Sequence, residues 1–514
     1  MNLKTKGYYF PKYSLLILAG ILVILFFVYG FDTILFMRPQ GVHQWRQCDS
    51  LSFTLNFYHN DGTFFSPVIH YLGRDGDGKT VSDFPLLYYG IGKLWQVTGY
   101  HEYIYRLIVL LISFAGLAAL VKTVEGILKD SFMGLFVALI LYSSTIFVYY
   151  SNNFLMNVPA FSFALIALFF FYKYYDSGKN KFLLISMAFF LLGGLLKTPA
   201  LMSFVAILGI FVLERILPVK FGKNGKLFPK PKIQIIPFLL VIILIILWYW
   251  YAASYNSKHN SGIFLIGILP IWKLDMAHIL DIIHYVRVLW LNSYHSKVMQ
   301  VIAIILFLAI LFSYKKSQKF LWYFMVLLGI GFLLFLMLFF QVFNHHDYYL
   351  INQLVFMLSI FTAFFYLLNH SFPKVFHSPV FRILLVLLLA YNVKVCAGNI
   401  HDRYYVEWLN PYNKEAKGLK NITPYLRSLG IKRTDPMLVE DDPSFDITLY
   451  FMDQKGYTTF GGRFRDSLEI RQAIGSGLKY LMVTDSSFLR RPYLQPFIKD
   501  RIGKWNKFYI FKLH

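Results

Sequence analysis

The chain has 514 residues, of which 57% are hydrophobic and 19% aromatic, while only 15% are charged. Soluble domains carry roughly 25% charged residues, so this composition excludes one large water-soluble protein and predicts a polytopic membrane protein. The formal net charge of +23 could indicate a nucleic-acid partner. The basic residues stand mostly in short segments beside apolar runs, however, where the positive-inside rule accounts for them, and we expect no nucleic-acid binding.

The N-terminal segment 1–13 is basic and leads into an apolar run that begins at Ser14. This order is also found in signal peptides. No small-residue cleavage site follows, and many further apolar runs come after it. We therefore predict that the run is retained as the first membrane helix.

Eleven apolar runs are long enough, or nearly long enough, to span a bilayer. The run at 182–217 is interrupted by Gly193-Gly194 and by Lys197-Thr198-Pro199, so it could form two helices or one kinked helix. If the N-terminus is cytoplasmic and 182–217 forms two helices, the turns at 151–156 and 344–348 both lie outside, and neither carries a Lys or Arg. A single span over 182–217 would invert every later segment, so the positive-inside rule favours two helices. The expected spans are 14–31, 103–121, 132–150, 157–175, 182–196, 199–217, 235–252, 298–313, 320–343, 349–368 and 379–397.

This topology places all the bulky hydrophilic segments on the outer face. They are the loop at about 32–102, the segment at about 253–297, and the tail. We expect a transmembrane domain over 1–397 and a small α/β extracytoplasmic domain over 398–514, because helical and strand patterns alternate in the tail. The expected helices are 413–429, 445–452 and 467–474, the expected strands 436–440, 457–460 and 480–484, and 505–513 is expected to be a last edge strand.

The stretch from Arg38 to Asp49, RPQGVHQWRQCD, concentrates polar chemistry just after the first apolar run. A carboxylate beside His43 and Arg46 at a membrane surface has a tunable pKa and could act as a general base. The alternative is that Asp49, together with Ser50, caps a short interfacial helix that follows. Both interpretations of Asp49 stay open at this point.

A second carboxylate, Asp83, precedes Pro85 late in the same loop, and its alternative interpretation is a turn residue. Between the two acids, residues 73–79 alternate acids with glycines, as in a calcium loop. The twelve-residue pattern has no closing glutamate, so we interpret 73–79 as a flexible turn. Cys48 and Cys396 give no metal pattern and could at most form one disulfide bond.

Three polar groups stand in or beside membrane segments, where such groups are costly and often functional. They are Arg106, Lys197 and the pair His345-His346. All three lie on the outer side in the expected topology, and together they indicate a phosphate-binding site. The alternatives are that Arg106 and Lys197 reach lipid headgroups, or that the histidines bind a metal, for which the cluster is too compact without a distant ligand.

With these motifs, the chain resembles the GT-C membrane glycosyltransferases, in the branch of the protein O-mannosyltransferases and the bacterial lipid A aminoarabinose transferases. The sequence departs from the family pattern in places, since Asp49 is followed by Ser50 instead of a second acid, Pro85 stands alone, and Met156-Asn157 replaces an acid. The resemblance rests on the HQWRQ-x-D string, Asp83-Phe84-Pro85-Leu86-Leu87-Tyr88, Arg106, Leu195-Leu196-Lys197-Thr198-Pro199 and His346-Asp347-Tyr348-Tyr349-Leu350.

The resemblance implies a glycosyltransferase that takes a sugar from a polyprenyl-phosphate donor and passes it to an envelope acceptor. Its expected location is the outer face of the bacterial cytoplasmic membrane, with a cytoplasmic N-terminus and a periplasmic tail. Asp49 is then the base, with Asp83 as the other catalytic candidate. No cofactor is expected, although metal dependence stays open. The expected substrate-binding residues are His43, Gln44, Trp45, Arg46, Arg106, Lys197, His345, His346 and Tyr348.

Two other functions use similar substrates. A transporter or flippase of lipid-linked sugars should show paired, interrupted helices in two halves, and no internal repeat is visible. An O-antigen polymerase or ligase usually has its large loop late in the chain, whereas the large loop comes first here. Both features favour the transferase.

Overall fold

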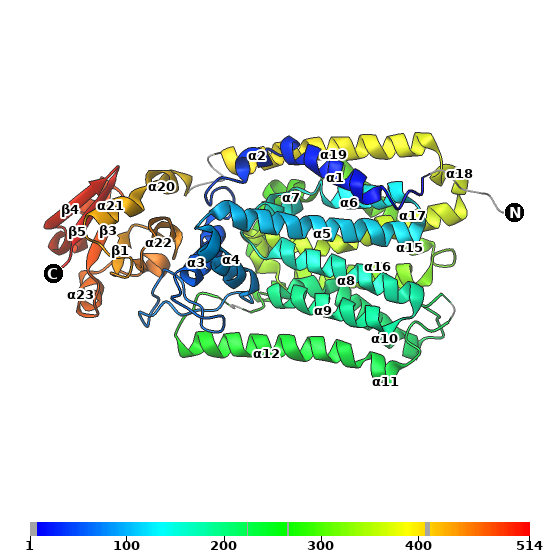
Figure 1. The fold of residues 1–514 in the computed structure, drawn as a ribbon, viewed down its shortest axis with the longest axis horizontal. Helices are drawn as coiled ribbons and strands as arrows, with labels where there is room; N and C mark the ends of the chain where they lie inside the picture. Colours follow the sequence, from blue (N-terminus) through cyan, green and yellow to red (C-terminus); the bar gives the residue numbers. More distant parts are fainter. Residues whose placement is uncertain (1–7, 224, 265–266, 407–411) are drawn as a thin grey trace. The chain divides into compact units, whose positions relative to one another are not determined.

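A computed structural model describes residues 8–223, 225–264, 267–406 and 412–514 of the chain (Figure 1). The chain divides into two compact units. One, the helical unit, comprises Met1–Phe36, Arg106–Trp248 and Gly267–His401. The other, the mixed unit, comprises Met37–Tyr105, Tyr249–Ile266 and Asp402–His514.

The helical unit consists of membrane-length helices joined by short segments. Seven helices of the described residues are long and apolar enough to cross a membrane, and two bent pairs would raise that number to nine. Two shorter apolar helices, α1 and α9, occupy the remaining expected positions. The main helices are α1 (Ser14–Val28), α5 (Glu102–Leu128), α6 (Ser131–Leu141), α7 (Thr145–Ser151), α8 (Asn157–Ser177), α9 (Asn180–Leu196), α10 (Met202–Ile216), α12 (Ile236–Lys258), α13 (Met276–Tyr285), α15 (Lys297–Phe312), α16 (Lys319–Leu338), α17 (Leu354–Ser371) and α19 (Pro379–Tyr405).

The shorter elements of the helical unit connect these helices. One of them, η3, is a π-helix between α13 and α14. They are α2 (Phe31–Ile34), η1 (Thr198–Leu201), α11 (Pro231–Gln234), η2 (Ile271–Lys273), η3 (Val286–Trp290), α14 (Leu291–Tyr294), η4 (Phe340–Asn344), η5 (Asp347–Gln353) and α18 (Pro373–Phe376).

The structure confirms two separate helices over 182–217. Lys197 between them has an extended backbone, with φ −154° and ψ 116°, and Pro199 opens the turn η1. Proline cannot donate the hydrogen bond that a continuous helix needs there, so α9 ends and α10 begins anew. Helices α8 and α9 pack along each other (Figure 1). A Cβ atom at Gly193 would stand 2.9 Å from the Ala160 carbonyl oxygen, so only glycine permits this approach.

The span expected over 132–150 consists of two helices instead of one continuous helix, because the chain bends by 79° between α6 and α7. At the bend, the Ser143 hydroxyl donates to the Ile140 carbonyl at 2.9 Å, and the Ser144 backbone is extended with ψ 120°. Serine side chains that bond nearby backbone groups compete with helical hydrogen bonds, which explains the break. The second bent pair joins α13–α14 to α15 at 89°.

A five-stranded sheet forms the C-terminal part of the mixed unit, in the order β2-β1-β3-β5-β4 (Figure 1). Strands β1 (Met437–Glu440), β2 (Gly456–Thr458) and β3 (Tyr480–Val483) are parallel, while β5 (Phe508–Lys512) runs antiparallel to β3 and to β4 (Asp500–Trp505). On one face, Leu438, Leu481 and Phe511 pack with side chains from the surrounding helices and turns. The α/β character of the tail is confirmed.

Two local expectations for the tail are wrong. The expected edge strand is β5, which lies inside the sheet, and the edge is β4, whose sequence DRIGKW is too polar for an alternating pattern. Charged residues are typical of edge strands, which they protect from further pairing. The helix expected over 413–429 is two short helices, α20 (Asn413–Gly418) and α21 (Ile422–Ser428), because Asn421 takes a left-handed backbone with φ 61°. The remaining elements are α22 (Ile447–Met452), η7 (Phe460–Gly462), α23 (Ser467–Gly475), η8 (Ser486–Arg490) and η9 (Pro492–Phe497).

The first loop is an integral part of the mixed unit. Its helices α3 (Gln44–Tyr58) and α4 (Leu86–Thr98) pack against each other, and α22 of the tail packs against α3. The backbone N–H of Gly456 in β2 donates to the His70 carbonyl at 3.1 Å, and the N–H of Leu72 donates to the Gly456 carbonyl at 2.8 Å. The loop thus continues the sheet next to β2.

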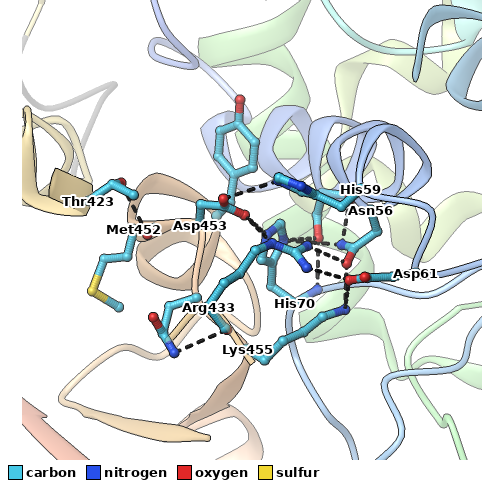
Figure 2. A network of polar contacts seen from close by, with 12 residues as sticks. Asn56, His59, Asp61, His70, Thr423, Arg433, Met452, Asp453 and Lys455 are labelled. Atoms are coloured by element: carbon cyan, nitrogen blue, oxygen red, sulfur yellow. Dashed lines mark hydrogen bonds and ion pairs between the residues drawn. The ribbon is translucent and has the colours of Figure 1, made fainter. Parts of the chain in front are cut away.

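A partly buried polar network also joins the loop to the tail (Figure 2). The carboxylate of Asp453 meets His59 Nε2 at 3.2 Å, His70 Nε2 at 3.1 Å and Arg433 Nε at 2.7 Å. Although burial raises it, hydrogen bonds from the two histidines and the Arg433 charge hold the pKa of Asp453 well below its usual range. Burial lowers the pKa of His70 to about 4, so this ring is neutral at physiological pH. The network therefore joins one carboxylate to two histidine rings and one guanidinium.

The second half of the same network is centred on Asp61. Arg433 Nη1 donates to the Asp61 carboxylate at 2.5 Å, and Lys455 Nζ lies 3.3 Å from it. Arg433 Nη2 also donates to the side chain of Asn56 at 2.9 Å, near the end of α3. The tail thereby holds the C-terminal turn of the helix whose first turns carry Arg46 and Asp49.

Candidate functional site

Helix α3 begins at Gln44, earlier than expected, and His43 is its N-cap with a left-handed φ of 59°. Asp49 therefore lies in the second turn and caps nothing, so the capping interpretation of Asp49 is wrong. Residues three apart share one face of a helix, which brings Arg46 and Asp49 together. The early start of α3 thus builds an ion pair where the sequence suggested a loop.

Arg46 joins the two acids that the sequence singled out. Its Nη2 donates to Asp83 Oδ2 and to the Ser82 hydroxyl, both at 2.7 Å, and its Nη1 donates to Asp49 Oδ2 at 3.4 Å. The guanidinium also lies 5.2 Å from the centre of the Phe264 ring. Arginine suits this position because its planar fork reaches two carboxylates at once.

Asp49 and Asp83 differ in how fully they are bonded. Asp83 Oδ2 accepts from Arg46, from the Tyr88 hydroxyl at 2.9 Å and weakly from Ser82. Asp49 is only 2% exposed, and its Oδ1 accepts no hydrogen bond from any residue that the structure describes. Burial raises the pKa of Asp49 to about 7, against the effect of Arg46 and with a further increase from Asp83. A carboxyl group that titrates near neutral pH with one unbonded oxygen has the properties of a general base.

A third carboxyl group, which no motif in the sequence indicates, lies near α3. Asp446 stands just before α22, the tail helix that packs against α3, and its side chain is fully buried. Burial raises the pKa of Asp446 well above its usual range, and the charge of Asp49 adds to the increase. Tyr88, which bonds Asp83, was also missed as a site residue, although it ends the quoted motif. A hydroxyl five residues after an acid is too common to be singled out by pattern.

The neighbouring residues of α3 have supporting contacts within the mixed unit. The Gln44 amide donates to the Pro39 carbonyl at 2.8 Å and fixes the turn before the helix. The ring of Trp45 packs edge-on against Phe445 at 5.4 Å and Phe460 at 5.7 Å. His43 is half-buried at the helix start.

A cavity of about 470 Å³ adjoins the Arg46 cluster and lies wholly within the mixed unit. Phe264, the ring beneath Arg46, is part of its wall. Asn256, also in the wall, accepts from the Val81 N–H at 2.7 Å and donates to the Val81 carbonyl at 2.8 Å. Because Val81 precedes Ser82 and Asp83, this pair of bonds fixes the segment that carries the second acid.

The other predicted residues belong to the helical unit. Arg106 is fully buried in α5, donates to the Asn152 carbonyl, and lies 4.2 Å from the Phe154 ring centre. Further along the chain, the Asn157 amide donates to the Tyr348 carbonyl at 3.2 Å, in the segment that follows His345 and His346. The structure thus links Arg106 to Tyr348 through the turn between α7 and α8.

Lys197 and the histidines lie on neighbouring segments of the helical unit. Lys197 is half-buried and precedes η1, which contacts η5. His345 is exposed, while His346 is half-buried with its ring 5.2 Å from that of Tyr348. Next to them, Asp347 is fully buried and accepts from the Tyr150 hydroxyl at 2.7 Å.

The described residues form neither a metal-binding cluster nor a disulfide bond. Across the described ranges, no three His, Cys, Asp or Glu side chains are grouped so that they could hold a metal ion. In the loop at 73–79, Asp75 accepts from Asn260, and Asp77 pairs with His259 at 2.9 Å. Cys48 and Cys396 are both buried free thiols, so the disulfide that the sequence left open does not form.

Comparisons with known proteins agree with this architecture. A family model described as dolichyl-phosphate-mannose-protein mannosyltransferase matches residues 83–250. The crystal structures of ArnT from Cupriavidus metallidurans, apo and bound to undecaprenyl phosphate, align over 97% of this chain and 97% of theirs, with a TM-score of 0.61 and 11% identity. None of the curated proteins matches the sequence significantly.

Two further structures share the fold. The apo oligosaccharyltransferase of Archaeoglobus fulgidus aligns over 94% of this chain and 70% of its own, with a TM-score of 0.56 and 11% identity. The mycobacterial arabinofuranosyltransferase AftD aligns over 97% of this chain and 40% of its own, with a TM-score of 0.51 and 12% identity. The family model matches residues 83–250, and the likeness to these structures shows the GT-C fold that the sequence predicted.

Proposed function

We propose that the protein transfers a sugar from a polyprenyl-phosphate donor to an envelope acceptor on the outer face of the bacterial cytoplasmic membrane. The observation that carries the proposal is the state of Asp49. It is a buried carboxyl group with a pKa of about 7. One of its oxygens accepts a hydrogen bond from Arg46, and the other accepts none from the described residues. The acceptor is a glycolipid, a glycan or a protein.

In the proposed reaction, Asp49 takes the proton of the acceptor hydroxyl. The oxygen then bonds to the anomeric carbon of the sugar, and the bond from that carbon to the lipid phosphate breaks. The released lipid phosphate carries the electron pair of that bond, so cationic groups stabilise it as it leaves. Arg46 orients the Asp49 carboxylate, and Asp83 in turn orients Arg46 through its 2.7 Å bond.

For the donor phosphate we propose Lys197 and His346, on the neighbouring segments of the helical unit, with Arg106 and Tyr348 shaping the turn beside them. The likeness to ArnT bound to undecaprenyl phosphate, and to the archaeal AglB in complex with a dolichol-phosphate, supports a lipid-phosphate donor. The excess of Lys and Arg in the expected cytoplasmic loops supports a cytoplasmic N-terminus and an outer-face site.

The test uses purified full-length protein in liposomes that contain a panel of undecaprenyl-phosphate sugars and an envelope extract as acceptor. We expect release of undecaprenyl phosphate, measured by mass spectrometry, only when the acceptor is present. Asp49→Asn should reduce release by about 10²- to 10⁴-fold, the usual contribution of a general base. Asp281→Asn is the matched control, because Asp281 is an exposed aspartate on α13.

Other outcomes would contradict the proposal. Movement of the donor across the bilayer without release of lipid phosphate would identify a flippase. Growth of one lipid-linked glycan on another would identify a polymerase. Full release by the Asp49→Asn variant would remove Asp49 as the base, with Asp83 as the next candidate.

A further inference from the structure

The cavity beside the Arg46 cluster has a distinctive charge. Its wall contains two arginines, Arg74 and Arg463, and no Asp or Glu. The closest acids along the chain, Asp75 and Asp77, are bonded to Asn260 and His259. The cavity wall therefore has a net positive charge that nothing in the wall neutralises.

Both arginines have donors left for a ligand. Arg463 uses Nη1 to donate to the Tyr71 hydroxyl and the Gly73 carbonyl, each at 3.3 Å, which orients its guanidinium at the cavity. Arg74 is exposed, and no residue in the described ranges forms a hydrogen bond or ion pair with it. Free guanidinium donors at a cavity wall are suited to phosphate and carboxylate oxygens, which they can bind in pairs.

The rest of the wall has the chemistry of a carbohydrate site. Asn260, Ser257 and Ser261 supply amide and hydroxyl groups, which can both donate and accept. The rings of Phe264 and Phe460 supply flat apolar surfaces. Pockets that combine apolar surfaces with a few oriented polar groups are typical binding sites for small ligands, and sugars present both kinds of surface.

The position of the cavity relates it to the acceptor. The Phe264 ring lines the cavity and also contacts the Arg46 guanidinium, and Asn256 in the wall bonds Val81, just before Ser82 and Asp83. A molecule bound in the cavity would therefore stand beside the residues proposed to activate the acceptor hydroxyl.

We propose that this cavity binds the acidic portion of the acceptor, so that the acceptor is a carbohydrate bearing phosphate or carboxylate groups. This inference rests on the proposed function and specifies its acceptor class. Arg74 and Arg463 bind the acidic group, while the amides, hydroxyls and rings of the wall bind the sugar. The 470 Å³ volume lies within the range of small-molecule binding sites.

The test is equilibrium binding to purified full-length protein in detergent without any donor. The probes are trigalacturonate, mannose 6-phosphate and neutral maltotriose, and saturation-transfer NMR and calorimetry report binding. We expect at least one acidic probe to bind about tenfold or more tightly than maltotriose, and its Kd to increase with salt. The two acidic probes distinguish a carboxylate from a phosphate source.

Variants assign the effect to the cavity. Arg74→Gln and Arg463→Gln should each raise the Kd of the acidic probe by about tenfold, the scale of one charge-assisted hydrogen bond. Arg471→Gln, an exposed arginine on α23, is the matched control and should leave it unchanged. Arg463 also bonds the loop at 71–73, so Arg463→Gln can disturb the folding of that loop as well as binding. Arg74 is exposed, so Arg74→Gln tests binding without an effect on folding.

The inference is overturned if the acidic probes bind no tighter than maltotriose, or if both arginine variants bind like Arg471→Gln. Binding needs no donor, so it is independent of transfer. Acidic binding without sugar transfer would refute the proposed function alone. Transfer to neutral acceptors with no acidic preference would refute this inference alone.

Discussion

Replacing Asp49 by Asn tests the most unusual electrostatic property of the protein. The pKa of Asp49 is raised from 3.8 to about 7, mainly by burial. The folded state therefore holds this proton more tightly than the unfolded state. Ionising Asp49 then costs folding free energy that is absent below pH 4, develops between pH 4 and 7, and is fully present above pH 7.

The size of the effect follows from the shift. Each pKa unit corresponds to 1.36 kcal/mol, so a shift of this size costs the folded state at most about 4 kcal/mol above neutral pH. Asparagine has nearly the same shape and does not titrate, so the Asp49→Asn variant lacks this pH-dependent cost. Its amide oxygen can still accept from Arg46, and the lost charge attraction to Arg46 is already included in the shift.

The assay is thermal unfolding of the purified protein in detergent, followed by tryptophan fluorescence between pH 5 and 8.5. We expect the Tm of Asp49→Asn, relative to the unmodified protein, to rise from pH 5 to about pH 7 and to level off above it. Asp281→Asn is the control and should follow the unmodified protein at every pH. A Tm difference that is the same at all pH values would show that Asp49 titrates normally, and the reasoning from burial would fail.

Three further changes test other contacts. Asp83→Asn removes a charge that raises the pKa of Asp49, so the midpoint of the pH–rate profile should move to lower pH, and an unmoved midpoint would contradict the coupling. Asp453→Asn should make the tail more sensitive to proteolysis, because it removes the charge that pairs with Arg433, and unchanged digestion would contradict a role in docking. Arg382→Gln breaks a buried pair with Asp130 at 2.6 Å and should lower the Tm, and adding Asp130→Asn should recover part of the loss.

The sequence predicted much of the architecture because its strongest signals are local. Apolar runs of membrane length identified the positions of the helices, and Pro199 with its neighbours identified the break between α9 and α10. Short apolar strands such as Met437–Glu440 and Tyr480–Val483 were recognised because they are buried on both faces. In each case the pattern and the fold depend on the same few residues.

The errors occurred where local patterns compete with tertiary contacts. The start of α3 was placed too late because Asp49-Ser50 has the composition of a cap, whereas His43 in a left-handed conformation fills that position. The edge strand β4 was missed because its outward residues are charged. The bend after α6 depends on serine hydroxyls that bond the backbone, which a hydropathy pattern does not detect.

For the candidate site, the sequence identified the acids but could not relate them. Arg46 and Asp83 are 37 residues apart, and nothing in their spacing indicates that they form a 2.7 Å ion pair. The contribution of the tail was even less accessible, because Asp453 meets His59 across 394 residues. Such contacts depend on how the first loop and the tail fold together, which is a property of the mixed unit as a whole.

The central claim is that Asp49 accepts the proton of the acceptor hydroxyl. The most direct measurement is the single-turnover rate of sugar transfer from undecaprenyl-phosphate sugar in liposomes, as a function of pH. We predict that the rate of the unmodified protein rises tenfold per pH unit below pH 7 and levels off above it, while Asp49→Asn is slower by about 10²- to 10⁴-fold with no inflection near pH 7. An Asp49→Asn variant that keeps the full rate and the same inflection would contradict it.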